Sequence, residues 1–305
     1  MSRARGALLI AGPTASGKSA LAIVLAQRLS GVVINADSMQ VYADLRILTA
    51  RPVAEDQAAV PHRLYGHVPA AEAYSVGRWL DDMREILAEA GRSGLKPIVV
   101  GGTGLYFSAL TGGLSDMPRV PDDIRAHWRG RAAEEGAPAL HAALAARDPV
   151  MAARLRPSDP QRVVRALEVL DATGRSLSEW QGLRGVALVE PEMRLVVDLP
   201  REELAARIDA RSAAMLEAGA LAEVEALLAR GLDQRLPAMK ALGVAALGAH
   251  LRGEISVEEA LLRVQAGTRG YARRQMTWFR NRFADWPRLR PQDAVEAVLA
   301  RGHEK

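Results

Sequence analysis

The chain has 305 residues, of which 49% are hydrophobic and 25% charged, a composition that indicates a globular protein with a sizeable core and excludes wholesale disorder. No apolar run approaches the ~18 residues of a membrane-spanning helix, and the short one at 7–11 is unlike a secretion signal, so we expect a cytoplasmic protein. Cysteine is absent, which excludes disulfides, thiolate catalysis and thiolate zinc sites.

The net charge is +4, from 40 basic and 36 acidic side chains. Lysine occurs only at 18, 96, 240 and 305, so arginine supplies nearly all of the positive charge. Two explanations stay open at this point: a codon bias toward arginine, or an anionic partner, since the guanidinium fork suits phosphate.

The first third of the chain alternates strands with helices. An apolar strand at 7–11 is followed by a glycine loop at 12–17 and a periodic helix at 18–29. A second strand at 32–34, a helix at 79–90 and a third strand at 98–100 follow. This alternation predicts an α/β fold whose parallel sheet is flanked by helices.

From Pro118 to about Trp180, short helical stretches separated by prolines replace the strands. A strand at 195–197 then leads into helices at 204–229, with a break near Gly219, and at 256–282, where Ser256 and Glu259 predict a capping box. We therefore expect a P-loop-type catalytic domain made of 1–115 and 195–305, with a mostly helical insertion domain at 116–194.

The segment Gly12–Ser19, GPTASGKS, fits the phosphate-loop pattern G-x-x-x-x-G-K-[ST] and lies between a strand and a helix. Glycines let the backbone amides converge on a phosphate, and Lys18 neutralises its charge. The Ser19 hydroxyl is the candidate Mg²⁺ ligand. The motif predicts a di- or triphosphate ligand without saying which bond is broken.

Two carboxylates follow predicted strands. Asp37 comes after the second strand, whose end opens onto the same crevice as the phosphate loop, so it is either a base or a turn residue. Asp198 ends the strand at 195–197 and is either a Mg²⁺ ligand or the cap of the next helix.

Several further segments, together with the loop, make the chain resemble the bacterial tRNA dimethylallyltransferases, also called tRNA isopentenyltransferases. They stand in the family's order from about residue 8 to 282: DSMQVY at 37–42, TARP at 49–52, PHRL at 61–64, VVGGTGLY at 99–106, DPQRVVRALE at 159–168, RIDAR at 207–211 and RRQMTWFR at 273–280. The chain departs from the pattern at 242–246, where LGVAA replaces the usual tyrosine and polar pair and leaves any tRNA contact by those side chains in doubt.

The resemblance implies transfer of a dimethylallyl group from its diphosphate to the exocyclic amine of the adenine 3′ of the anticodon, in tRNAs that read codons starting with U. It implies Asp37, Thr103 and Arg211 as catalytic residues, with Mg²⁺ as cofactor. Asp37 would take the amine proton, Thr103 would hydrogen-bond the amine or a phosphate oxygen, and Arg211 would clamp the diphosphate. The implied diphosphate-binding residues are Gly12, Pro13, Thr14, Ala15, Ser16, Gly17, Lys18 and Ser19.

The family also implies a surface that binds the tRNA anticodon stem-loop. The residues concerned are Asp37, Ser38, Met39, Gln40, Thr103, Arg125, Gln161, Arg162, Val163, Val164, Arg165, Lys240, Gly243, Arg273 and Arg280. Arg162 and Arg165 share one helix face, which suits phosphate contacts, although a solvated face with an Arg165–Glu168 pair is the alternative. Trp278 and Phe279 are expected to pack in the core rather than to stack on bases.

Three other functions remain alternatives: an adenylate isopentenyltransferase that acts on a free nucleotide, a small-molecule P-loop kinase, and a non-catalytic RNA-binding module. The last leaves Lys18, Ser19 and Asp37 unexplained. We expect a monomer, because one chain can hold one anticodon arm, and no membrane partner.

Overall fold

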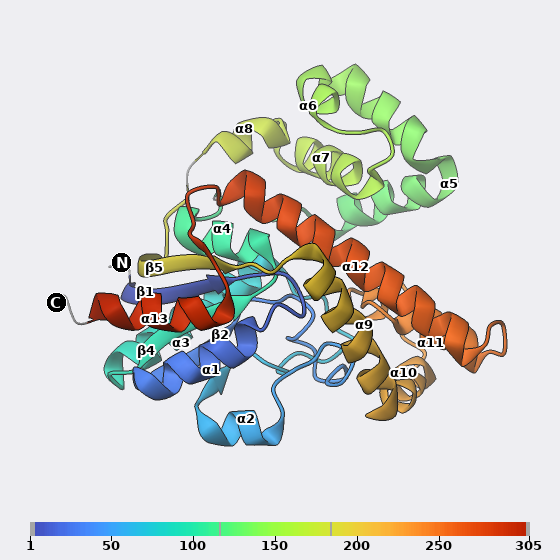
Figure 1. Ribbon diagram of the computed structural model, residues 1–305. Helices are drawn as coiled ribbons and strands as arrows, with labels where there is room; N and C mark the ends of the chain where they lie inside the picture. Colours follow the sequence, from blue (N-terminus) through green and yellow to red (C-terminus); the bar gives the residue numbers. More distant parts are fainter. Residues whose placement is uncertain (1–3, 116, 184, 303–305) are drawn as a thin grey trace. The chain divides into compact units, whose positions relative to one another are not determined.

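The computed structural model describes residues 4–115, 117–183 and 185–302. Its centre is a six-stranded sheet with the strand order β3-β2-β4-β1-β5-β6, in which every pairing is parallel (Figure 1). The strands are β1 (Ala4–Ala11), β2 (Gly31–Asn35), β3 (His62–Arg63), β4 (Lys96–Gly101), β5 (Val189–Val197) and β6 (Arg288–Leu289). The α/β prediction from the alternating elements is therefore confirmed.

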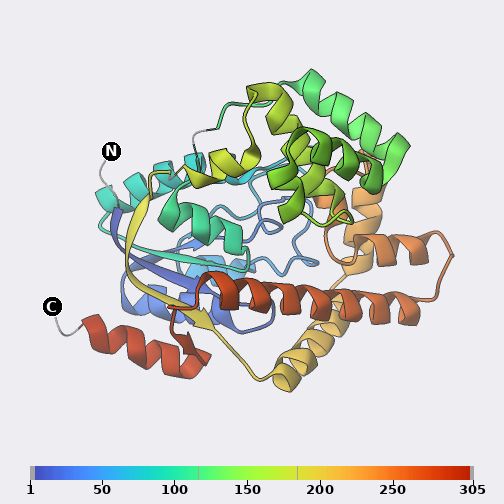
Figure 2. The same cartoon turned by 90° about the horizontal axis from the view of Figure 1, so that it is seen from above.

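Helices cover both faces of the sheet (Figures 1 and 2). On one face, α1 (Lys18–Arg28) packs with α13 (Pro291–Gly302), while α3 (Val76–Arg92) and α4 (Gly104–Gly112) lie on the other. Alternate strand residues point to opposite faces, so Leu8, Ile10, Ile98 and Val100 join the apolar side chains of α1 in one buried cluster. The packed sheet holds the ends of its strands, and the loops that follow them, in fixed positions.

The carboxyl ends of the central strands carry the candidate site. Parallel strands end at the same edge of a sheet, and β1 lies between β4 and β5. The loop after β1, the segment after β2 and the turn after β4 therefore meet at one edge. The short helix α2 (Ala54–Ala59) lies further along the segment after β2.

After β5 the chain forms a run of helices: α9 (Arg201–Glu217), α10 (Ala220–Ala229), a 3₁₀ turn η1 (Ala238–Lys240), α11 (Val244–Leu251) and α12 (Val257–Arg282). The expected break at Gly219 is confirmed, because this residue has φ 99° at the start of α10. Ser256 caps α12 as predicted by accepting the Glu259 N–H, whereas the Glu259 carboxylate pairs with Arg263, 2.8 Å away, four residues on.

Residues 112–186 form a separate compact unit. It contains α5 (Asp122–Arg147), α6 (Pro149–Arg154), α7 (Pro160–Thr173) and α8 (Leu177–Gly182). Gly136 has φ 78° and breaks α5 just before Pro138. The unit has its own apolar core, centred on α5 and α7 and including Trp128, Leu140, Leu144 and Leu167.

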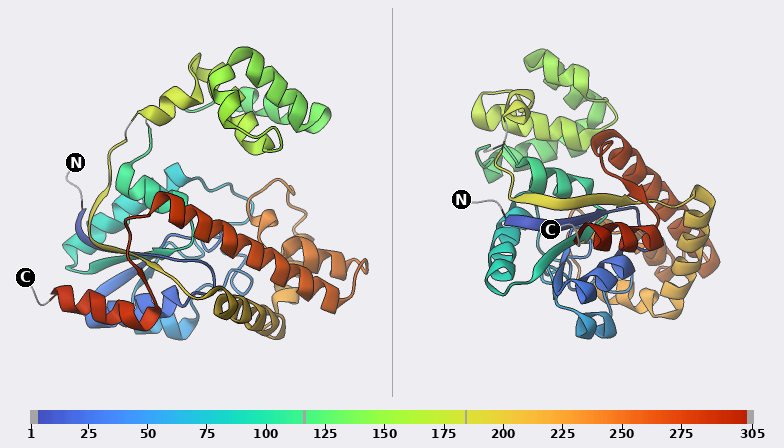
Figure 3. Two further views of the ribbon diagram at one scale, coloured as in Figure 1. Left: turned by 45° about the horizontal axis from the view of Figure 1, so that its top comes forward. Right: turned by 60° about the vertical axis from the view of Figure 1, so that its left-hand side comes forward.

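The insertion expected at 116–194 has different boundaries in the structure. The residue expected to begin it, 116, lies outside the described residues, and residues 187–194 belong to the sheet-containing unit. Strand β5 begins at Val189, six residues before the predicted start, and runs alongside β1 (Figure 3). Among the described residues, its first half pairs only with β1, and β6 joins at Val196. This half is therefore a sheet edge, where Pro191 is tolerated because no second strand needs its missing N–H.

No helix in the described part of the chain combines the length and the apolar character that crossing a membrane requires.

Candidate active site

The loop between β1 and α1 curls around a concavity. Gly17 is left-handed at φ 88°, and Ala15 is left-handed at φ 64°. A β-carbon at Gly12 would lie 2.9 Å from the Ser16 hydroxyl oxygen and 3.1 Å from the Val197 carbonyl oxygen, so the loop needs glycine there. Alternation of left- and right-handed residues turns successive N–H groups toward a common centre that suits an anion.

Lys18 begins α1 with its ammonium folded back on the loop. The Lys18 Nζ donates to the Pro13 carbonyl oxygen at 3.1 Å. Burial, opposed by the Asp37 carboxylate and assisted by Arg211, lowers the pKa of Lys18 to about 8. The negative charge of an arriving phosphate would stabilise the protonated form of Lys18 in this setting. The next residue, Ser19, is exposed in the first turn of the helix.

A cavity of about 360 Å³ opens beside this loop. It joins the phosphate loop to the segment after β2 and to α9, which are distant in sequence. Its lining residues are Thr14, Ala15, Gly17, Lys18, Ser19, Ala20, Asp37, Gln40, Thr49, Ala50, Arg207 and Arg211. Three cations and one carboxylate therefore face a space beside a phosphate-binding loop.

Arg211 reaches the loop from α9. Its Nη2 donates to the Thr14 hydroxyl oxygen at 2.5 Å, and burial lowers the pKa of the guanidinium while Asp37 raises it. The Arg211 Nε is buried without a hydrogen-bond partner among the described residues, which leaves a donor for a ligand. Arg207, one turn earlier, lines the same cavity and was not singled out from the sequence.

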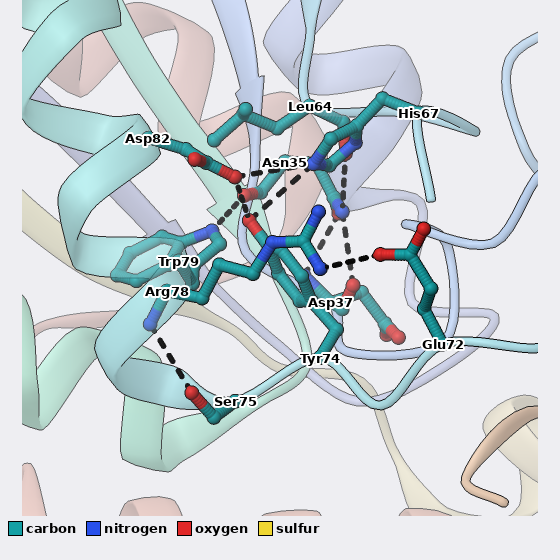
Figure 4. Close-up of polar contacts among 10 residues, drawn as sticks. All are labelled: Asn35, Asp37, Leu64, His67, Glu72, Tyr74, Ser75, Arg78, Trp79 and Asp82. Atoms are coloured by element: carbon teal, nitrogen blue, oxygen red, sulfur yellow. Dashed lines mark hydrogen bonds and ion pairs between the residues drawn. The ribbon is translucent and has the colours of Figure 1, made fainter. Parts of the chain in front are cut away.

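Asp37 is held by its neighbour Asn35, which is fully buried (Figure 4). The Asn35 Nδ2 donates to the Asp37 carbonyl oxygen at 2.9 Å and to the Leu64 carbonyl oxygen at 3.0 Å, and the Asn35 Oδ1 accepts the Asp37 N–H at 2.8 Å. The Trp79 indole N–H donates to the Asn35 carbonyl oxygen at 2.9 Å. One Asp37 carboxylate oxygen, Oδ1, accepts the Met39 N–H at 3.0 Å. Asn35 thus fixes the backbone from which the Asp37 carboxylate projects.

Thr103 follows β4 and is tied to the same segment. Its N–H donates to the Ala36 carbonyl oxygen at 3.1 Å, and its hydroxyl oxygen accepts the Ser38 N–H at 3.0 Å. The hydroxyl also lies 3.3 Å from the Ser38 hydroxyl oxygen. The hydroxyl is thus used to join the two strand ends, and its part in catalysis stays a prediction.

Gln275 on α12 connects the phosphate loop to the turn after β4. Its Oε1 accepts the Thr14 N–H at 3.0 Å, and its Nε2 donates to the Gly102 carbonyl oxygen at 2.9 Å. Gln275 stands in the family segment at 273–280, but no local pattern in the sequence indicates its contact across 261 residues. Tyr271, one turn earlier, shares this face of α12, where burial and the Asp37 charge raise its pKa.

The glycines of this turn make room for α12. A β-carbon at Gly102 would lie 2.1 Å from the Gln275 Nε2, and one at Gly104 would lie 2.1 Å from Trp278. Trp278 therefore packs against the turn, and Phe279 is fully buried and stacks on Phe283. Phe279 therefore packs in the core as expected, whereas Trp278 is only partly buried.

Comparison with known proteins agrees with this geometry. The family model described as IPP transferase matches residues 40–282, and one described as isopentenyl transferase matches residues 5–66. A tRNA dimethylallyltransferase of Methylocella silvestris is 57% identical over 96% of this chain and 98% of its own. The chain belongs to the tRNA dimethylallyltransferase family.

Solved structures of the family have the same fold. The tRNA isopentenylpyrophosphate transferase of Bacillus halodurans matches with a TM-score of 0.69 and 32% identity, over 98% of this chain and 97% of its own. A eukaryotic dimethylallyltransferase, described as acting on tRNA, matches with a TM-score of 0.77 and 30% identity, over 91% of this chain and 70% of its own. The family resemblance drawn from the sequence motifs is thereby confirmed.

The helical unit carries part of the family's predicted tRNA surface. Gln161 and Arg162 are exposed, and Arg165 is partly exposed on the same helix. Arg162 lies 3.3 Å from Asp159, and Arg165 lies 3.4 Å from Glu168, so the alternative ion pair exists. Arg125 pairs similarly with Asp122 at 3.4 Å.

Two residues predicted to bind tRNA face inward instead. Val163 is fully buried and Val164 is 9% exposed, and both belong to the core of the helical unit. The amphipathic spacing of α7 turns their side chains away from solvent, so their part in tRNA binding stays a prediction.

Of the other tRNA candidates, Asp37 and Gln40 line the phosphate-loop cavity, whereas Lys240, Gly243, Arg273 and Arg280 do not. Lys240 is exposed at the end of η1, and Gly243 begins α11 with φ 99°. Arg273 and Arg280 line a larger cavity of about 580 Å³ between α9 and α12, to which Asp198 also contributes. No phosphate-loop residue lines this larger cavity, so size alone does not mark the reacting centre.

Asp198 does not cap the helix that follows it, one of the two roles considered from the sequence. Its carboxylate accepts from Arg288 at 3.4 Å, and Pro200 occupies the N-cap of α9. Within residues 4–115, 117–183 and 185–302, no three histidine or acidic side chains gather into a metal site. The Ser19 hydroxyl, on the phosphate-loop cavity, is an oxygen donor that fits Mg²⁺ once diphosphate oxygens complete its shell.

Proposed function

We propose that this protein transfers a dimethylallyl group from dimethylallyl diphosphate to the exocyclic amine of the adenine 3′ of the anticodon, in tRNAs that read codons starting with U. The observation that carries the proposal is the phosphate-loop cavity, where Asp37 and Arg211 face the loop in a member of the tRNA dimethylallyltransferase family. The products are the prenylated tRNA and diphosphate.

The donor side must stabilise the leaving group. Cleavage of the carbon–oxygen bond moves charge onto the diphosphate, and donors aimed at that charge lower the barrier. Lys18, the Arg211 Nε and the loop amides are suited to this role, because each donor belongs to a residue that lines this cavity. When bound, Mg²⁺ would be held by Ser19 and would neutralise further diphosphate charge.

The acceptor side must raise the reactivity of a poor nucleophile. The exocyclic amine forms the new carbon–nitrogen bond and loses one proton, which the Asp37 carboxylate accepts. The Asn35 contacts support this role, because they hold the peptide groups on both sides of the Asp37 Cα and leave its carboxylate at the cavity. The acceptor base must leave its stack to reach this point.

The alternatives are less well supported. The isopentenyl transferase family model covers only residues 5–66, whereas the IPP transferase model covers residues 40–282. A free-nucleotide acceptor would not require the exposed side chains of Gln161 and Arg162, and a kinase would require an adenine site for ATP. We also infer that the enzyme works as a cytoplasmic monomer, since tRNA is found there and one chain can hold one anticodon arm.

The test follows a labelled dimethylallyl group. The protein is incubated with labelled dimethylallyl diphosphate and Mg²⁺, together with unmodified tRNA, the same tRNA with guanine in place of the acceptor adenine, AMP, or no acceptor. We expect label only in the first tRNA. Label in AMP alone would establish the free-nucleotide enzyme, and label in the guanine tRNA would overturn the assigned acceptor.

A further inference from the structure

A carboxylate on α10 holds the backbone of the segment that follows β2. Glu223 accepts three successive N–H groups: its Oε1 from Arg46 at 2.6 Å and from Ile47 at 2.7 Å, and its Oε2 from Leu48 at 2.8 Å. Hydrogen bonds to an ionised acceptor are among the stronger ones in proteins. One side chain thus fixes three consecutive peptide units from about 175 residues away along the chain.

Side-chain packing holds the same segment a second time. The Leu48 side chain fills the space beside Gly243, where a β-carbon would lie 2.8 Å from the Leu48 Cδ1. The Ile47 Cδ1 lies 3.8 Å from the β-carbon position of Gly219. Leu48 and Ile47, whose N–H groups Glu223 accepts, therefore pack beside Gly243 and Gly219, the glycines that precede α11 and α10. This packing gives Gly243 a role independent of any tRNA contact.

The next residues along the chain form a wall of the phosphate-loop cavity. Thr49 and Ala50 line this cavity, and Gln40 lines it while donating to the carbonyl oxygens of both, each at 2.9 Å. Ala50 is left-handed at φ 53°. A residue with a β-carbon keeps that conformation only where its surroundings impose it, so the wall depends on what holds the preceding peptides.

We infer that Glu223 is a positioning residue for the diphosphate pocket, acting through residues 46–48 on the wall formed by Thr49 and Ala50. This inference rests on the proposed function in taking the pocket's ligand to be the donor diphosphate. The carboxylate sets the backbone before the wall, and Gln40 then ties the wall to the start of the same segment. Asp37 is fixed separately by Asn35, so removal of the Glu223 carboxylate should affect donor binding more than proton transfer.

The decisive variants are Glu223→Ala, Glu223→Gln and the matched control Glu225→Ala, which changes an exposed carboxylate two residues away. Calorimetry with inorganic diphosphate and Mg²⁺ measures the pocket without any transfer reaction, and steady-state transfer gives the KM of donor and of tRNA. We expect Glu223→Ala to weaken diphosphate binding and raise the donor KM by roughly tenfold, since displacement of a binding group by ~1 Å costs up to ~10²-fold.

Glu223→Gln should fall between the wild type and Glu223→Ala, because the amide keeps one acceptor oxygen and turns an N–H donor toward a peptide N–H. It also keeps the inference testable if Glu223→Ala does not fold. The tRNA KM and the kcat at saturating donor should change less than twofold in folded variants. Diphosphate affinity equal to that of Glu225→Ala would overturn the inference, as would donor and tRNA KM rising together. Failure of the proposed function is a separate result, since wild type would then transfer no label to tRNA.

Discussion

Replacement of Gln275 by alanine should disturb the two halves of the active site at once. The change removes the hydrogen bonds to the Thr14 N–H and the Gly102 carbonyl oxygen, at 3.0 and 2.9 Å. Leaving a buried polar group unsatisfied costs about 1–3 kcal/mol. Gly102 is buried whereas Thr14 is partly exposed. Leaving the Gly102 carbonyl without a hydrogen bond should therefore cost more free energy than leaving the Thr14 N–H without one. We expect a total loss of roughly 2–4 kcal/mol of stability and a Tm lower by several degrees.

The same variant should lose activity, because Thr14 also holds Arg211 and Gly102 precedes Thr103. Shifts of about 1 Å between donor and acceptor groups reduce kcat/KM by up to ~10²-fold. Gln275→Glu separates the two hydrogen bonds, since it keeps an acceptor for Thr14 and removes the donor for Gly102. Gln265→Ala is the control, because Gln265 is partly exposed on the same helix and makes one 3.3 Å bond.

Thermal unfolding and single-turnover transfer to tRNA measure the two effects on the same preparations. The reasoning would be refuted by a Gln275→Ala enzyme whose Tm and kcat/KM both match those of Gln265→Ala. A variant with a lowered Tm and unchanged kcat/KM would leave Gln275 as a structural residue only.

The other predictions concern the donor, the base and the RNA surface. The kcat/KM for the donor should fall as pH rises through about 8, where Lys18 loses its proton, and this fall should vanish in Lys18→Met. Asp37→Asn should lower the single-turnover rate by ~10²-fold or more, with donor affinity nearly unchanged; a near-normal rate would exclude Asp37 as the base. Replacing Arg162 and Arg165 with alanine should make the log–log salt slope of tRNA binding shallower by about 0.7–0.9 for each phosphate that an arginine no longer neutralises, and an unchanged slope would remove this helix face from RNA recognition.

The local sequence pattern was sufficient to predict the parts of the site that depend on residues close together in the chain. The spacing of Gly12, Gly17 and Lys18 sets the curl of the loop and the start of α1, so the sequence predicted both. The position of Asp37 could be predicted because all strands of a parallel sheet end at one edge, although β4 lies between β2 and β1. Core packing was predicted for Phe279 as well, and it is fully buried.

Other features depended on partners that the sequence does not indicate. The first half of β5 was missed because Glu190 and Pro191 interrupt its apolar pattern, which an edge with a single neighbour tolerates. Val163 and Val164 were predicted to bind tRNA from their family segment, whereas the helical unit buries them in its core. Gly243 was expected to serve RNA, and the structure shows that it makes space for Leu48.

The sequence by itself determined the phosphate loop, the parallel α/β sheet and the family, because each depends on residues close together in the chain or on ordered local motifs. The tertiary structure alone decided how the site is held. Gln275 meets Thr14 across 261 residues, and Glu223 meets Ile47 across 176. A single polar side chain has no periodicity to indicate its partner, so such contacts become visible only when the packing of α10 and α12 brings the two segments together.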